Sequence, residues 1–113
     1  MANGDTTNQL RRGALTQLIL AIVSKGPTYG LSIVKELRSS SALSTPEGAV
    51  YPLLSRMEEA NLLASEWSLA ESPHPRRYFS LTPLGAQELA DFRVDWEEFK
   101  RALDGILQGS ERN

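Results

Sequence analysis

The chain has 113 residues, 41% hydrophobic and 23% charged, a balance typical of one folded domain and not of a disordered segment. It contains no cysteine and one histidine, which excludes disulfides, thiolate-bound metal centres and sites built from several histidines. No apolar run approaches the roughly 20 residues of a membrane-spanning helix, and the N-terminus lacks a secretory signal pattern. The sequence therefore predicts a cytoplasmic protein with no membrane, metal or cofactor.

The charge is unevenly distributed. The net charge of −2, from 12 basic and 14 acidic side chains, by itself argues mildly against a nucleic-acid partner. Residues 83–113, however, hold four basic and seven acidic side chains, whereas residues 1–60 hold six and five. Because charges act over about 10 Å at ordinary salt, their placement matters more than the total. DNA therefore remains a candidate partner of the N-terminal part.

The N-terminal part predicts two helices after a short tail. Residues 1–8 are small and polar and are interpreted as a flexible tail. From Leu10 onward, apolar residues recur at three- and four-residue steps, which predicts a helix that ends at Gly26-Pro27. A second helix is expected from Thr28 to Arg38, where a run of serines ends it.

Sequence signals for a helix start and a helix end delimit a third helix. The stretch Ser44-Thr45-Pro46-Glu47 has the capping-box pattern of a helix start, and the helix is expected to reach about Ala60. Pro52 inside it removes one backbone hydrogen bond and should kink the helix. Asn61 tolerates the left-handed conformation that closes a helix.

The apolar period then changes from the helical repeat to alternation. Two strands are expected over 62–69 and 76–81, joined by a loop over 70–75, and together they form a hairpin. Thr82 as cap and Pro83 as first residue open a long last helix.

This order predicts a mainly α fold with a small β-hairpin wing, a winged helix-turn-helix followed by a long C-terminal dimerisation helix. The predicted domain boundaries are 9–82 for the DNA-binding domain, 83–108 for the dimerisation helix and 109–113 for a second tail.

The last helix carries a heptad pattern of apolar residues in steps of three and four. It is too short for an autonomous coiled coil, so we expect it to pack on the first helix of its own chain and on a second copy of the protein. The predicted dimer interface is Leu15, Leu18, Leu89, Phe92, Trp96, Phe99, Leu103 and Ile106.

Two basic or polar surfaces are candidates for DNA contact. The outward face of the third helix carries small or hydrogen-bonding residues, namely Thr45, Gly48, Pro52, Ser55 and Arg56, with Tyr51 at its border. Such a face suits a major groove, but a solvated helix face has the same composition. Arg76 and Arg77 near the hairpin tip suit phosphates, yet they also fit an ordinary exposed pair.

Catalysis is not expected. His74 lies between two prolines, and no nucleophile with an orienting carboxylate accompanies it in the sequence. The chain also lacks a glycine-rich phosphate loop. We therefore predict that the protein is not an enzyme.

Residues 13–82 resemble the PadR family of bacterial transcriptional regulators, in its compact form with a single C-terminal dimerisation helix. The matching pieces are Gly13-Ala14-Leu15, Gly26-Pro27-Thr28-Tyr29-Gly30, Glu47-Gly48-Ala49-Val50-Tyr51-Pro52-Leu53-Leu54, Leu62-Leu63 through Trp67, and Arg77-Tyr78-Phe79-Ser80-Leu81-Thr82 with Gly85. This chain departs from the family pattern at Asn61, where glycine is usual, and at Leu31, where tyrosine is frequent.

The resemblance implies a homodimeric repressor bound to a palindromic operator. Carried over onto this chain, the groove contacts are Tyr29, Thr45, Gly48, Tyr51, Ser55 and Arg56, and the backbone contacts are Lys35, Arg76 and Arg77.

Two further possibilities stay open at this level. Some compact family members hold flat hydrophobic drugs between aromatic side chains, which would involve Trp96, Phe92 and Phe99 here, although the same stripe is also explained by interface packing. The alternative to a regulator is a winged-helix protein-interaction module that does not bind DNA, an interpretation that the negative net charge favours slightly.

Overall fold

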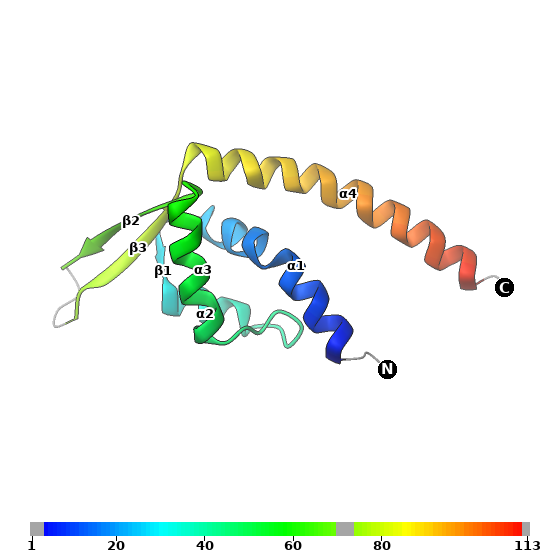
Figure 1. Cartoon of the computed structure of the whole chain (residues 1–113), viewed down its shortest axis with the longest axis horizontal. Coiled ribbons are helices and arrows are strands. Elements are labelled where there is room, and N and C mark those ends of the chain that lie inside the picture. The colour runs from blue at the N-terminus through cyan, green and yellow to red at the C-terminus, as the bar shows by residue number, and fades with distance from the viewer. Residues whose placement is uncertain (1–3, 70–73, 112–113) are drawn as a thin grey trace.

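Four helices and three strands are present in the residues that the computed structural model describes, 4–69 and 74–111. In chain order they are α1 (Gly4–Val23), β1 (Thr28–Tyr29), α2 (Gly30–Leu37), α3 (Glu47–Glu59), β2 (Leu63–Ser68), β3 (Arg76–Leu81) and α4 (Pro83–Glu111). Helices α1–α3 form a body, the β2–β3 hairpin projects from one end, and α4 runs across the body and past α1 at the other (Figure 1). The mainly helical winged-helix architecture is confirmed.

Both terminal helices are longer than predicted. α1 begins at Gly4, so residues 4–8, expected to be a tail, are helical, and α4 continues to Glu111. Asp5 lies in the first turn of α1, where a negative charge interacts favourably with the helix dipole. The polar composition of this stretch hid that signal. Residues 1–3 and 112–113 of the two predicted tails lie outside the described residues.

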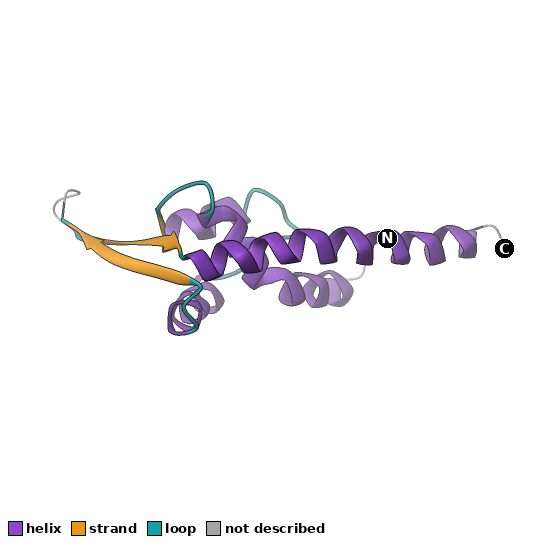
Figure 2. Ribbon diagram, turned by 90° about the horizontal axis from the view of Figure 1, so that it is seen from above, coloured by secondary structure: helices purple, strands orange, loops and turns teal. Residues whose placement is uncertain are grey.

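The sheet has three strands in the order β1-β3-β2, not the two strands of the predicted hairpin. Thr28 and Tyr29, expected to open the second helix, instead pair with Phe79 and Tyr78 of β3, and α2 begins at Gly30. A two-residue strand is too short to show an apolar period, so the sequence pattern missed it. The β2–β3 pairing follows the prediction and is seen at one end of the molecule in Figure 2. Positions 70–73 of the predicted loop lie outside the described residues.

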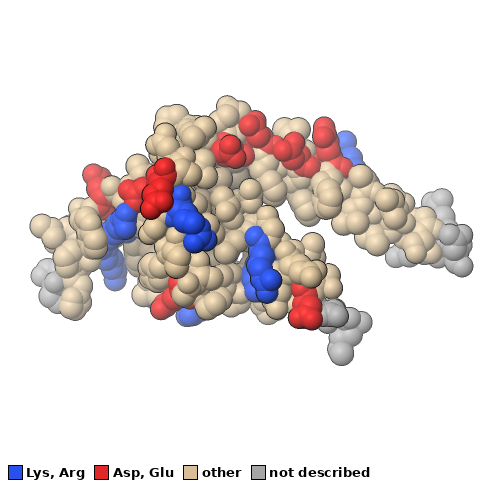
Figure 3. Space-filling view, in the orientation of Figure 1, with Lys and Arg blue, Asp and Glu red and all other residues tan. Residues whose placement is uncertain are grey.

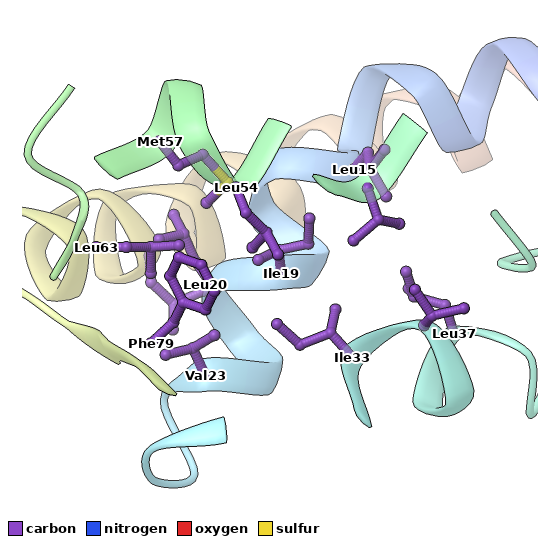
Figure 4. Close-up of a cluster of buried hydrophobic side chains, with 13 residues drawn as sticks. Leu15, Ile19, Leu20, Val23, Ile33, Leu37, Leu54, Met57, Leu63 and Phe79 are labelled. Atoms are coloured by element: carbon purple, nitrogen blue, oxygen red, sulfur yellow. The ribbon is translucent and has the colours of Figure 1, made fainter. Parts of the chain in front are cut away.

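The hydrophobic core joins α1, α2, α3, the sheet and the first turns of α4, as the labelled side chains in Figure 4 illustrate. Its buried residues are Leu15, Ile19, Leu20, Val23, Ile33, Val34, Leu37, Val50, Leu54, Met57, Leu63, Phe79 and Leu89. Leu15 and Leu89 are only 9% and 6% exposed, so almost none of their surface is left for a partner chain. Their assignment to the dimer interface is therefore wrong.

The start of α3 also differs from the prediction. Pro46 occupies the N-cap position without a side-chain cap hydrogen bond, so the expected capping box does not form. Thr45 is buried, and its hydroxyl donates to the carbonyl of Leu43 at 3.0 Å. This local bond ties Thr45 back to the preceding turn and removes it from any surface that DNA could reach. The helix continues through Pro52 to Glu59.

The junction between α3, the hairpin and α4 follows the sequence closely. Asn61 has a φ of 63°, which confirms the left-handed residue that closes α3. The hydroxyl of Thr82 donates to the carbonyl of Asn61 at 2.6 Å and accepts from the amide of Gly85 at 2.9 Å, which confirms Thr82 as the cap of α4. A Cβ at Gly85 would overlap the carbonyl oxygen of Leu62, so glycine permits this close approach.

Candidate nucleic-acid interface

The helix α3 divides into a buried and an exposed face, as its apolar period predicted. Val50, Leu54 and Met57 are in the core. Gly48 and Arg56 are exposed on the opposite side. An exposed helix with small and hydrogen-bonding side chains can enter a major groove of about 12 Å.

Several of the predicted DNA-contacting residues meet around one depression of about 450 Å³. It lies between the N-terminus of α2, α3 and the outer half of the hairpin. Of the nine residues predicted to contact DNA, five line it: Tyr29, Tyr51, Ser55, Arg76 and Arg77. The tertiary structure thus brings together residues from α3, β1 and β3, which are far apart in the sequence.

Arg76 lies over the ring of Tyr29. Its guanidinium carbon lies 4.3 Å from the centroid of the Tyr29 ring, a cation–π geometry. The Tyr29 ring in turn meets the Tyr78 ring edge-on, with 5.5 Å between centroids. Arg76 remains exposed. The aromatic pair therefore positions a cationic group at the surface, next to the exposed face of α3.

Arg77 is engaged within the subunit. Its guanidinium forms an ion pair with Glu58 of α3, and its Nε donates to Ser65 Oγ at 2.9 Å. The same guanidinium lies 5.1 Å from the centroid of the Phe79 ring. These contacts orient the side chain toward α3, while 37% of the side chain stays exposed, so the predicted contact of Arg77 with the DNA backbone stays a prediction.

The other predicted contacts have mixed outcomes. Lys35, Gly48 and Arg56 are exposed but lie outside the depression. Thr45, only 4% exposed, is excluded as a contact because it is buried. Trp67 was missed as a candidate although it lines the depression and is 67% exposed. In the predicted strand, Trp67 alternates with its neighbours and so shares a face with the polar Ser65. This position on a partly polar face was the sequence signal that could have identified Trp67.

The outer part of α4 carries a large exposed apolar stripe. Its exposed members are Trp96, Phe99, Leu103, Ile106 and Leu107. Phe92 and Trp96 stack with 6.5 Å between ring centroids, and Trp96 and Phe99 follow at 6.4 Å. A contiguous exposed apolar stripe of this kind is typical of an interaction surface.

Two apolar depressions flank these aromatic rings where α4 diverges from α1. One of about 580 Å³ is lined by residues that include Leu18, Phe92 and Trp96. Another of about 450 Å³ is lined by Leu10, Phe92, Trp96 and Phe99, among others. Phe92 and Trp96 line both depressions and therefore separate them.

The charged side chains are distributed unevenly over the surface. Figure 3 shows a mostly acidic row of side chains along α4, whereas acidic and basic side chains lie close together over the helical body and the hairpin. Among residues 4–69 and 74–111, no group of three or more histidine, aspartate or glutamate side chains could hold a metal ion. No helix in the described part of the chain is long and apolar enough to cross a membrane.

Comparison with known proteins places this geometry in a family. The model of the transcriptional regulator PadR-like family matches residues 19–91. A PadR family transcriptional regulator from Eggerthella lenta is 31% identical, with a TM-score of 0.82 over 91% of this chain and 89% of that chain. A transcriptional regulator from Mycobacterium tuberculosis is 30% identical over 97 residues, which cover 86% of this chain and 89% of that protein.

A more distant structure shares the fold. PadR from Bacillus subtilis, solved in complex with operator DNA, superimposes with a TM-score of 0.67 at 22% identity, over 72% of this chain and 46% of that chain. The relatives are transcriptional regulators and not enzymes, in agreement with the missing nucleophile–base pair. The chain belongs to the PadR-like family of transcriptional regulators.

Proposed function

We propose that the protein is a homodimeric repressor that binds a palindromic DNA operator. The observation that carries this proposal is the convergence of Tyr51 and Ser55 from α3 with Arg76 from the hairpin around one depression. Support comes from the family, in which the Bacillus subtilis PadR structure contains operator DNA.

In this proposal α3 enters the major groove and the hairpin follows the backbone. Gly48, Tyr51, Ser55 and Arg56 would face the bases, because they form the exposed part of α3. Phosphates would be met by side chains outside α3, which carry no sequence information themselves. These are Lys35 and Arg76, whereas Tyr29, which lines the depression beside α3, would contact the groove.

A second copy of the chain would cover the apolar stripe of α4. The radius of gyration of 16.6 Å is well above the value of about 13 Å for a compact domain of this length, because α4 extends beyond the body. The interface would be formed by Phe92, Trp96, Phe99, Leu103 and Ile106, with Leu18 of α1. A two-fold dimer then presents two α3 helices to two operator half-sites.

Selection of bound sequences from a random DNA pool, with the purified protein at moderate salt, tests the proposal. We expect enrichment of one palindrome, with affinity that falls steeply as salt increases because phosphate contacts release counterions. If a folded, dimeric protein enriched no sequence, the protein-interaction module would be the better interpretation, with α4 as its binding surface.

We further propose that a flat hydrophobic effector binds beside Trp96 and releases the DNA. The two depressions that share Phe92 and Trp96 support this idea, and Asp95 at the rim of one of them would favour a cationic ligand. A planar cationic dye should quench tryptophan emission in a Trp67→Phe variant, whose remaining emitter is Trp96. Unquenched emission, or equal dye binding after Trp96→Ala, would mean that the aromatic stripe only packs the dimer.

A further inference from the structure

Three polar side chains connect α3 to both strands of the hairpin. Glu58 of α3 forms an ion pair with Arg77 of β3 and accepts a hydrogen bond from Ser65 Oγ of β2 at 2.7 Å. Arg77 Nε completes the triangle by donating to the same Ser65 oxygen at 2.9 Å. The side chains of Arg77 and Glu58 are 37% and 30% exposed, so water screens this cluster less than a fully exposed ion pair.

The cluster lies just beyond the part of the hairpin that contributes to the buried core. Leu63 and Phe79 anchor the inner half of the hairpin in the core. Farther out, Trp67 is paired with Arg77 across the strands and is 67% exposed, and Arg76 is exposed one position beyond. The Tyr29–Tyr78 contact joins the outer half to β1, and the polar cluster of Glu58, Ser65 and Arg77 joins it to α3.

We propose that Glu58 is a positioning residue for DNA binding. It acts through Arg77 to hold the β2–β3 hairpin, the wing of the fold, at a defined angle to α3. The inference rests on the proposed function, because it concerns the simultaneous contact of α3 and Arg76 with one DNA duplex. Two contacts on a rigid frame reinforce each other, and this gain is lost when the frame becomes loose.

The expected change in DNA affinity on removal of the Glu58 charge is opposite to the change that electrostatics alone would give. Glu58 is an acidic residue on the helix that would face DNA, so removal of its charge should strengthen binding if charge alone mattered. A positioning role predicts that the same removal weakens binding. Glu59, the next residue on α3, is exposed and provides the matched control for loss of one carboxylate.

The first test compares Glu58→Gln and Glu59→Gln on the selected operator, by titration at several salt concentrations. We expect Glu58→Gln to bind about three- to tenfold more weakly and Glu59→Gln to bind as well as the wild type or better. In an Arg76→Ala background the effect of Glu58→Gln should shrink, because the wing contact that Glu58 positions is already lost. Equal or tighter binding by Glu58→Gln, or full additivity with Arg76→Ala, would overturn the proposal.

The second test needs no DNA and so separates this inference from the proposed function. Because the chain has no cysteine, spin labels attach cleanly to an Ala49→Cys, Leu69→Cys double variant, with one label on α3 and one on the outer hairpin. The distance distribution should broaden with Glu58→Gln and stay narrow with Glu59→Gln. An unchanged distribution would overturn the positioning role even if the protein binds its operator. Failure of the wild type to select any operator would instead overturn the proposed function.

Discussion

The ring of Tyr51 in α3 lies directly against Gly30, the first residue of α2. A Cβ at position 30 would overlap the ring at Cε1 and lie 3.0 Å from Cζ. Gly30 does not have a positive φ, so glycine is required here for space and not for backbone freedom. The contact determines where the exposed part of Tyr51 stands on the surface that we propose to meet DNA.

Gly30→Ala should therefore impair operator binding more than it impairs stability. Tyr51 is 43% exposed, so its ring can swing outward at little cost, but its hydroxyl then moves away from the depression that Tyr51 lines together with Ser55. We expect a loss on the order of 1–3 kcal/mol in operator binding, the size of one base contact. Calorimetric or fluorescence titration measures it, with Gly109→Ala as control because nothing lies within 4 Å of that glycine. Equal losses in both variants would contradict this explanation.

Gly85→Ala should destabilise the whole fold. The added methyl would overlap a backbone oxygen, that of Leu62, and a backbone atom cannot rotate away as a side chain can. We expect a loss of about 1–3 kcal/mol in the free energy of unfolding, as for other overpacked sites. Urea denaturation followed by circular dichroism measures this value. An unchanged denaturation midpoint would show that α4 can shift without cost.

Substitutions in the hairpin and in α3 should affect DNA binding in different ways. Arg76→Ala should weaken binding to operator and unrelated DNA by a similar factor, because phosphates are the same in every sequence. Arg56→Ala should instead change the preferred base at one operator position, at about 1–3 kcal/mol. Repeated selection from the random pool with each variant distinguishes the two. A shifted motif with Arg76→Ala would contradict the assignment of this residue to the backbone.

Phe99→Asp should break the proposed dimer. Phe99 is 59% exposed on the isolated subunit, and an aspartate buried there by a partner chain would leave an uncompensated charge. A penalty of about 3–5 kcal/mol is typical of such a charge and should shift the protein to monomers at micromolar concentration. Sedimentation velocity measures the oligomeric state directly. Gln108→Asp, on another side of the heptad pattern, should remain dimeric, and a dimeric Phe99→Asp would place the interface elsewhere.

Local patterns predicted the parts of the fold that depend on neighbouring residues. Asn61 and Thr82 were predicted correctly because helix ends place special demands on residues within one turn. The exposed apolar positions of α4 were readable for the same reason, since they recur at a fixed helical spacing. The capping box at Ser44 failed because Thr45 bonded to Leu43 and Pro46 took the cap position.

The sequence alone thus determined the order of the elements, the winged-helix class and the two faces of α3, because periodicity and capping are properties of short segments. Only the tertiary structure decided that β1 joins the sheet, that Leu15 is in the core, and that Arg77 forms an ion pair with Glu58. Such pairings join residues up to about fifty positions apart. Their partners are chosen by the packing of the whole chain, which no local pattern records.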